Sequence, residues 1–330
     1  MYEQFYNLKQ NPFNVTPDPH FLYLGEKHRE ALAHLVYGIK EKKGFIVITG
    51  EVGTGKTTLI HCLLERFDRG NGTKAAFIFN PRLGAAEFIQ FVLKDLGLAV
   101  QGWTKGDSLQ ALNEYLLHAY ERGERVILIV DEAQGLAPNV LEEIRLLSNL
   151  ETSKSKLLQI VLAGQPELDR ILAREEFRQI RQRINMRYYL SPLSEKETEE
   201  YIEKRLQIAG AKGPLFTKKA IKEVYRNSGG IPRLINILCD NSLLDGYSSD
   251  KRIIDTNLVK EVAEDLKLEK KLRIDRVHIL LGVLIMACIL LGVFLQQSGQ
   301  LRIVLGELLH QLQSLKDFIW KGVQAVPRIF

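Results

Sequence analysis

The stretch Gly50-Glu51-Val52-Gly53-Thr54-Gly55-Lys56-Thr57 matches the pattern G-x-x-x-x-G-K-[ST]. It follows an apolar run over residues 45–48 and precedes a helical pattern that begins at Leu59. A strand, a glycine-rich turn and a helix in this order predict a phosphate-binding loop, because the N–H groups of the turn and the positive end of the helix dipole face the same anion. Without a ligand, the same stretch would be a glycine-rich strand–helix turn.

The pattern also assigns roles within the loop. Lys56 is expected to reach the β- and γ-phosphates of ATP, and Thr57 is expected to hold Mg²⁺. The full set of expected ATP-binding residues here is Gly50, Glu51, Val52, Gly53, Thr54, Gly55, Lys56, Thr57 and Thr58.

Two carboxylates directly follow another apolar run, residues 126–130. Asp131 and Glu132 stand where a predicted strand ends, and ligands of open α/β sheets bind at that end. We expect Asp131 to help hold Mg²⁺. Glu132 is expected to be the general base for the attacking water, since a carboxylate tied to a metal cannot do both tasks. Taken alone, the run could also end in a solvated acidic turn.

The arrangement of apolar runs predicts the fold. Short runs at 45–49, 75–79, 126–130, 157–163 and 186–190 alternate with helical patterns near 56–68, 84–97, 107–122, 138–150 and 166–183. Such alternation indicates βαβ units, and hence an α/β fold with a parallel sheet covered on both faces in three layers. We expect this nucleotide-binding domain over residues 1–191.

Helical patterns alone follow residue 191. Ser194 and Glu197 form a capping box at the start of one helix, and further patterns lie near 217–227, 231–248 and 255–268. These features predict a small α-helical lid domain over 192–268.

The composition of the chain gives weaker indications of its partners and of its compartment in the cell. The chain of 330 residues has a net charge of +5, which is weak evidence for a nucleic-acid or anionic-lipid partner. Its cysteines, Cys62, Cys239 and Cys288, lie far apart without metal-type spacing, which fits a reducing compartment. The N-terminus lacks the pattern of a secretory signal peptide.

Residues 277–295 contain no Asp, Glu, Lys or Arg. A helix of that length spans roughly 28 Å, close to the thickness of the bilayer core, so we expect a transmembrane helix rather than a buried core helix. Lys and Arg gather on its N-terminal side, and the positive-inside rule then places residues 1–276 in the cytoplasm. Residues 296–330 carry a heptad stripe of Leu and Ile, which predicts a short extracytoplasmic amphipathic helix or a short coiled coil.

Taken together, these features resemble an AAA+ ATPase. Besides the Walker A loop (50–57) and the Walker B strand (126–132), the chain has a polar Gln165 after the next strand, arginines before the last one, and Gly229-Gly230-Ile231-Pro232-Arg233 in the helical part. The N-terminal patterns Phe5-Tyr6-x-Leu8-x-x-x-Pro12-Phe13 and His28-Arg29-Glu30-Ala31-Leu32 narrow the resemblance to the general secretion pathway A family, which has relatives in pilus-biogenesis and exopolysaccharide loci.

The resemblance implies further site residues. Gln165 matches sensor 1, which contacts the γ-phosphate or the lytic water, and Arg233 matches sensor 2 of the lid. Arg183 is the first choice and Arg181 the second for an arginine finger that acts on a neighbouring subunit's ATP. Pro12 and Phe13 resemble the segment near adenine. The plainer alternatives are a helix-start residue for Gln165, a surface arginine for Arg233, a basic helix face for the arginines, and simple core for Pro12 and Phe13.

The resemblance also implies partners and a place in the cell. A finger supplied by a neighbour requires a ring or filament of identical subunits. We expect an ATPase in the bacterial inner membrane that serves a secretion, pilus or polysaccharide-export apparatus through an inner-membrane partner. Secretion A proteins typically carry a periplasmic peptidoglycan-binding domain, for which residues 296–330 are too short. The alternatives are a DNA-acting AAA+ regulator, which the membrane helix argues against, and a nucleotide switch that does not hydrolyse ATP.

Overall fold

The computed structural model of the chain describes residues 1–266, apart from 17, 69–71, 80–82, 100–101 and 154. Within these residues, no helix is both long and apolar enough to cross a bilayer. The predicted transmembrane helix at 277–295 and the amphipathic tail at 296–330 lie outside the described residues.

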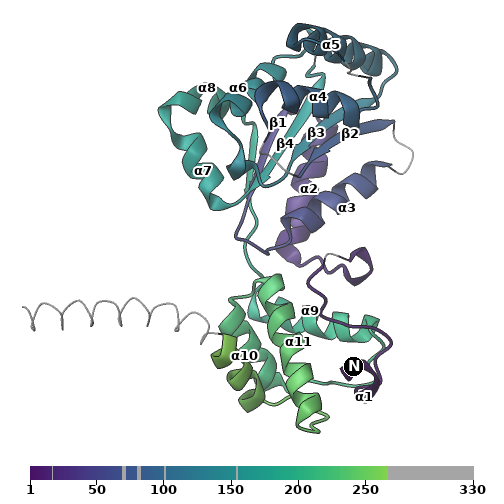
Figure 1. Cartoon of the computed structure of the whole chain (residues 1–330), viewed down its shortest axis with the longest axis vertical. Coiled ribbons are helices and arrows are strands. Elements are labelled where there is room, and N and C mark those ends of the chain that lie inside the picture. The colour runs from purple at the N-terminus through teal and green to yellow at the C-terminus, as the bar shows by residue number, and fades with distance from the viewer. Residues whose placement is uncertain (17, 69–71, 80–82, 100–101, 154, 267–330) are drawn as a thin grey trace, which may run out of the picture. The chain divides into compact units, whose positions relative to one another are not determined.

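A five-stranded parallel sheet forms the core of the first part of the chain (Figure 1). Its strands are β1 (Phe45–Thr49), β2 (Thr73–Ile78), β3 (Arg125–Val130), β4 (Leu158–Gly164) and β5 (Met186–Tyr189), in the spatial order β2-β3-β4-β1-β5. All five residues of β1 are buried, as expected of a strand covered on both faces. The parallel α/β sheet predicted from the alternating runs is therefore confirmed.

Helices cover both faces of this sheet because successive side chains of each strand point to opposite faces. Phe45 and Val47 of β1 pack in one apolar cluster, and Ile46 and Ile48 pack in another. The first cluster includes α4 (Ala85–Asp95), α5 (Lys105–Glu121), α6 (Pro138–Leu147), α7 (Pro166–Ala173) and α8 (Arg178–Arg183). The second includes α2 (Glu26–Lys40) and α3 (Lys56–Asp68).

The helical pattern near 166–183 is interrupted in the structure. Arg174 is extended, with φ −62° and ψ 150°, and a 3₁₀ turn, η3 (Glu175–Phe177), follows it. The break lets Phe177 reach the core, where its side chain is 5% exposed. Arg181 stabilises it by donating to the carbonyl oxygens of Leu172 (3.2 Å) and Ala173 (2.7 Å) at the end of α7. A periodic pattern cannot show such a break, because both halves bury apolar residues at helical spacing.

The second part is helical, with α9 (Glu195–Ile208), α10 (Lys218–Ser228), α11 (Pro232–Ser248) and a helix that begins at residue 256. Ser194 accepts a hydrogen bond from the Glu197 N–H, so the predicted capping box is present. The core of this part also contains aromatic residues from the N-terminus, which includes α1 (Tyr2–Phe5) and a 3₁₀ turn, η1 (Pro19–Phe21). The start of the chain, grouped above with residues 1–191, thus packs with the lid helices.

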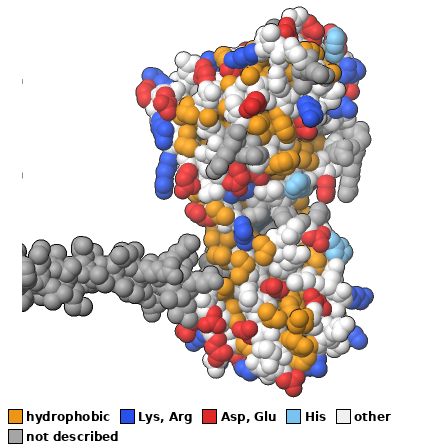
Figure 2. All heavy atoms as spheres, viewed as in Figure 1, with side chains coloured by type: hydrophobic (Ala, Val, Ile, Leu, Met, Phe, Trp, Pro, Cys, Tyr) orange, Lys and Arg blue, Asp and Glu red, His pale blue; other side chains and the backbone are white. Residues whose placement is uncertain are grey.

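Gly230 packs closely against Leu193 within the helical part. Its φ of +75° lies in the left-handed region, and a Cβ at this position would lie 1.9 Å from the carbonyl oxygen of Leu193. Only glycine fits there. On the face drawn in Figure 2, acidic and basic side chains are interspersed over the described residues.

Candidate active site

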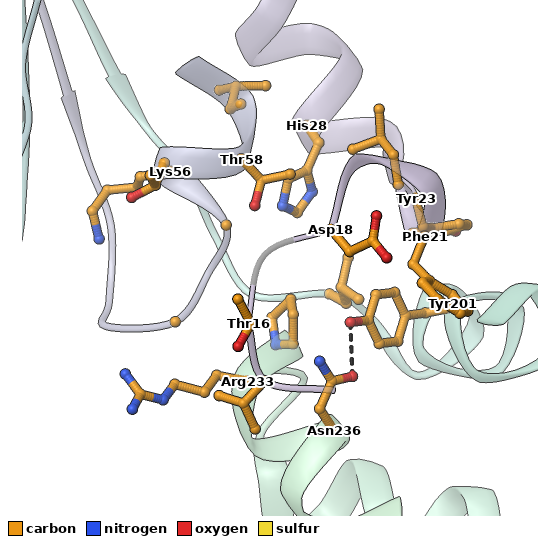
Figure 3. Close-up of a pocket in the computed structure, with 18 of the residues that line it drawn as sticks. Thr16, Asp18, Phe21, Tyr23, His28, Lys56, Thr58, Tyr201, Arg233 and Asn236 are labelled. Atoms are coloured by element: carbon orange, nitrogen blue, oxygen red, sulfur yellow. Dashed lines mark hydrogen bonds between the residues drawn. The ribbon is translucent and has the colours of Figure 1, made fainter. Parts of the chain in front are cut away.

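A cavity of about 450 Å³ lies where the phosphate loop, the N-terminal segment and the lid helices meet (Figure 3). The loop contributes Val52, Gly53, Gly55, Lys56, Thr57 and Thr58, and Glu132 lies at the same cavity. The lid contributes Leu193, Tyr201, Arg205, Pro232, Arg233 and Asn236. The structure therefore brings the Walker residues and the predicted sensor-2 arginine together at one cavity.

The backbone of the phosphate loop needs glycine at Gly53. Its φ is +81°, and a Cβ there would lie 2.6 Å from the Cβ of Arg233. The loop can therefore turn its N–H groups toward a ligand while lying directly against the lid. Gly50, Glu51 and Thr54 do not line the cavity. Thr54 is buried, and its hydroxyl donates to the carbonyl oxygen of Glu51 (2.9 Å).

Lys56 places a charge at the base of the loop. Its side chain is 5% exposed, and its Nζ donates to the carbonyl oxygens of Gly50 (2.8 Å) and Glu51 (3.0 Å). Burial lowers the pKa of this ammonium, whereas Glu132, Asp131 and Glu51 act in the opposite direction. Among the described residues, this buried ammonium donates hydrogen bonds to neutral carbonyl oxygens alone, so a phosphate would supply a counter-charge in direct contact.

The two predicted Mg²⁺ ligands are in direct contact. The Thr57 hydroxyl donates to Asp131 Oδ2 (2.6 Å), although the two residues come from α3 and from the end of β3. Mg²⁺ is bound in such sites by one or two protein oxygens together with phosphate oxygens and water. One hydroxyl and one carboxylate at hydrogen-bond distance fit that ion. Among the described residues, no group of three His, Cys, Asp or Glu side chains forms a separate metal site.

Glu132 is held by two amides. It adopts the left-handed conformation, with φ 51°, and its Oε2 accepts hydrogen bonds from Gln165 Nε2 (3.1 Å) and from Gln134 Nε2. Gln134 in turn accepts the Gln165 N–H on its Oε1 (3.0 Å). A left-handed conformation is costly for a residue with a side chain, and such strain gathers at functional sites. The structure thus places the predicted base, Glu132, in contact with the predicted sensor 1, Gln165.

The sequence interpretation missed Gln134. The signal was an amide two residues after Glu132, in the run Asp131-Glu132-Ala133-Gln134. It was missed because the 3₁₀ turn η2 (Ala133–Gly135), which brings Gln134 back toward the strand end, has no periodic pattern.

Arg233 reaches the site from the first turn of α11. Its N–H donates to the carbonyl oxygen of Gly53 (3.3 Å), and Pro232 occupies the position before it, where a helix needs no N–H donor. In Figure 3 its guanidinium extends toward the side of the cavity where Lys56 lies. A cation at this place can meet the phosphates, as the sensor-2 assignment expects.

The arginines before β5 do not line this cavity. Arg181 is bound to the end of α7, as described above, and Arg178 lies 3.5 Å from Glu175 in an exposed ion pair. Arg183, which is half-buried, lowers the pKa of Glu151 as a minor contribution after the Lys156 contacts. Neither Arg183 nor Arg181 therefore belongs to the cavity lining of its own chain.

Pro12 and Phe13 also lie outside the cavity lining. Phe13 is fully buried, and its ring meets that of Phe216 edge-on with centroids 6.2 Å apart. Asn14, Val15 and Thr16 line the cavity in their place. The plainer interpretation of Phe13 as core fits this geometry, because an apolar ring next to apolar lid helices is better buried there than at a polar cavity.

His28 is a second residue that the sequence interpretation did not assign to the site. It lines the cavity from α2, is 5% exposed, and its Nε2 donates to the Thr54 carbonyl oxygen (2.8 Å). Burial lowers its pKa. The hydrogen bond to Thr54 acts on the pKa in the opposite direction, and it ties α2 to the phosphate loop.

The chain is similar in sequence to a known domain family and to a known protein. Residues 39–172 match the model described as an AAA domain. General secretion pathway protein A of Aeromonas hydrophila is 45% identical over 252 residues, which make up 75% of this chain and 45% of that protein. The chain thus spans less than half the length of this relative.

Solved structures with the same fold have low sequence identity. The ORC2 protein of Aeropyrum pernix, in ADPNP–ADP complexes, has a TM-score of 0.59 at 18% identity and covers 78% of this chain and 71% of its own. Drosophila ORC bound to DNA has a TM-score of 0.59 at 18% identity, and the match covers 79% of this chain and 65% of the Drosophila chain. The Thermotoga maritima RuvB Holliday junction branch migration motor has a TM-score of 0.51 at 17% identity, and the match covers 78% of this chain and 74% of the RuvB chain. These similarities show the fold alone.

Proposed function

Since the chain belongs to the AAA+ ATPases of the general secretion pathway A family, we propose that it binds ATP with Mg²⁺ and hydrolyses the bond to the γ-phosphate. The observation that carries the proposal is the single cavity at which Lys56, Glu132 and Arg233 meet. Mg²⁺, when bound, would neutralise charge on the phosphate oxygens. Thr57 and Asp131 are the residues that would hold it.

The remaining roles belong to side chains of this chain. Lys56 and Arg233 supply positive charge from the loop and from the lid, and charge aimed at the phosphates stabilises the transition state. Glu132 orients and deprotonates the attacking water. Gln165 and Gln134 fix the carboxylate of Glu132, so they control when it is free to meet the water.

We further propose that the site is completed by a neighbouring subunit, which makes activity depend on a ring or filament. Support comes from the arginines before β5, which lie away from their own subunit's cavity. Arg183 stays the first choice for the finger, because the Arg181 guanidinium is already bound to the end of α7.

Mixing two inactive variants tests the finger. Lys56→Ala protein lacks its own site but keeps the finger, and Arg183→Ala protein has the converse defect. In an equal mixture, about one quarter of head-to-tail interfaces would pair an intact site with an intact finger, so we expect roughly that fraction of wild-type ATPase activity to return. The control mixes Lys56→Ala with the Lys56→Ala/Arg183→Ala double variant and should stay inactive. Co-assembled variants that recover nothing would rule out Arg183 as a finger in trans.

We also propose that residues 277–295 anchor the chain in the bacterial inner membrane, with residues 1–276 in the cytoplasm. The support is the sequence of this stretch and its basic N-terminal flank. Residues 1–266 contain equal numbers of basic (Lys, Arg) and acidic (Asp, Glu) side chains, so the net charge of +5 lies in 267–330. This balance gives the nucleotide-binding part little electrostatic attraction for DNA and disfavours the DNA-regulator alternative.

Membrane fractionation tests the anchor. The wild-type chain is expected to stay in the membrane pellet after an alkaline carbonate wash. Two arginines at Leu284 and Ile285 together cost about 5–7 kcal/mol of insertion free energy and should release the protein into the supernatant. Gly282→Ala is the matched control and should remain in the pellet. A wild-type chain that the wash removes would contradict the anchor while leaving the ATPase proposal intact.

The biological output that best fits these proposals is the assembly or operation of an envelope secretion, pilus or polysaccharide-export apparatus. The 45% identity to general secretion pathway protein A supports this choice. Affinity capture of the membrane form with crosslinking would identify the inner-membrane partner and distinguish the three systems.

A further inference from the structure

The N-terminal segment has two sides. One side buries Tyr2, Tyr6 and Phe13 among the lid helices. The other forms a wall of the active-site cavity and contributes Asn14, Val15, Thr16, Asp18, Phe21, Leu22, Tyr23 and Leu24. This wall therefore depends on how the segment is fastened to the lid.

Arg205 of α9 is the buried charge at that junction. It is 6% exposed; its Nε donates to the carbonyl oxygen of Pro12, and its Nη2 donates to that of Asn14 (3.4 Å). Its guanidinium also lies over the ring of Phe21, 4.8 Å from the centroid. Burying a charge is costly unless it is well hydrogen-bonded, so these contacts hold the segment in one place.

Two lid side chains complete the network around the same carbonyl. Arg205 Nη1 donates to the Tyr201 hydroxyl (2.8 Å), which donates to Asn236 Oδ1 (2.8 Å). Asn236 Nδ2 then donates to the carbonyl oxygen of Asn14 (3.3 Å). Figure 3 shows Tyr201 and Asn236 beside the cavity, joined by their hydrogen bond. The network links α9, α11 and the segment into a closed ring of hydrogen bonds.

The position of this network indicates which part of a nucleotide it serves. Lys56 and Thr57 mark the phosphate end of the cavity, and in Figure 3 Tyr201 and Asn236 lie across the cavity from Lys56. A nucleotide whose phosphates occupy the loop would extend its nucleoside toward the segment. The aromatic and polar lining there, which includes Thr16, Asp18 and Tyr201, suits a base and a ribose.

We propose that Arg205 is a positioning residue that, through the carbonyl oxygens of Pro12 and Asn14, fixes residues 14–16 as a wall for the nucleoside end of ATP. Affinity for a nucleotide then depends on Arg205, whereas affinity for its phosphates alone does not. The inference rests on the proposed ATP-binding function, and it assigns a role in that function to a residue that touches neither the phosphates nor the metal ligands.

Binding of two ligands to the full-length chain in detergent tests the proposal. Arg205→Lys keeps the charge but cannot reproduce the planar fork that reaches several acceptors. We expect its Kd for Mg²⁺–ATP to rise about tenfold or more, and its Kd for inorganic triphosphate to stay within about twofold of wild type. Tyr201→Phe, a milder change at the same network, should shift the ATP value in the same direction. Arg226→Lys, at an exposed arginine on α10, is the matched control.

Steady-state kinetics give a second measurement. The KM for ATP should rise in Arg205→Lys while kcat stays within about twofold, since the catalytic groups remain in place. Equal affinity of wild type and Arg205→Lys for ATP would overturn the inference, and so would a parallel loss of ATP and triphosphate binding, which indicates general disruption. A wild-type chain that binds neither ligand would instead overturn the ATP-binding function itself.

Discussion

Lys56→Ala is expected to abolish nucleotide binding and to lower ATP turnover by about three orders of magnitude or more. Its ammonium is the only cation that lies within the phosphate loop itself, among the residues that the structure describes. Its Nζ donates to the carbonyl oxygens of Gly50 and Glu51 at the base of the loop, and alanine removes the positive charge on which phosphate binding depends. Binding calorimetry with Mg²⁺–ATP and a phosphate-release assay measure the two effects.

The fold should survive this change. Burial already lowers the pKa of Lys56, which means that its charge is partly desolvated in the folded chain. Alanine removes this cost together with the two hydrogen bonds from Nζ, and these opposing changes should leave the thermal unfolding midpoint close to wild type. Lys74→Ala, at an exposed lysine of β2, is the matched control and should change neither binding nor turnover. Full ATP binding by Lys56→Ala would contradict the proposed site.

Glu132→Gln is expected to separate binding from hydrolysis. The amide keeps the size of the carboxylate but cannot accept a proton, so turnover should fall by about 10²- to 10⁴-fold while Mg²⁺–ATP binding is retained. Rapid-quench measurement of bound ATP should find it trapped and uncleaved. The contacts with Gln165 and Gln134 can persist through the amide oxygen, which keeps the site assembled.

The same variant tests the nucleotide-switch alternative. Glu65→Gln is the control, because it removes an exposed carboxylate of α3 without touching the phosphate loop or the proposed base. It should turn over ATP near the wild-type rate. If wild-type protein binds ATP without turnover at every concentration, and Glu132→Gln behaves the same way, the chain is a switch and not a hydrolase.

Motifs whose residues are local in sequence were predicted well. The phosphate loop, the capping box at Ser194 and the parallel sheet all depend on short-range patterns, and the structure contains each of them. The bounds predicted for 45–49 and 56–68 agree with the structure, and the bounds of the other strands and helices shifted by one to a few residues. The helix pattern over 166–183 was wrong in its continuity, because the break at Arg174 is stabilised by Arg181 from the following helix.

Contacts between distant segments were predicted less well. Glu132 and Gln134 both follow β3, and they reach Gln165 only because β3 and β4 are neighbours in the sheet. The family pattern that contains Phe13 does not show whether its ring packs near adenine or in the lid core. In the structure the ring packs against Phe216 in the lid core. Arg205 carries no motif, and its role rests on partners far away in the sequence.

The sequence by itself determined the chemistry of the phosphate site and the class of fold. The spacing of Gly50, Gly55, Lys56 and Thr57 sets a local backbone shape, and alternating apolar runs set a parallel sheet. Only the tertiary structure decided what closes the site. The lid, the N-terminal segment and the strand ends meet through single hydrogen bonds and close backbone approaches, such as Arg233 on Gly53. Such contacts leave no periodic trace in a sequence, because they join residues whose separation along the chain carries no regular spacing.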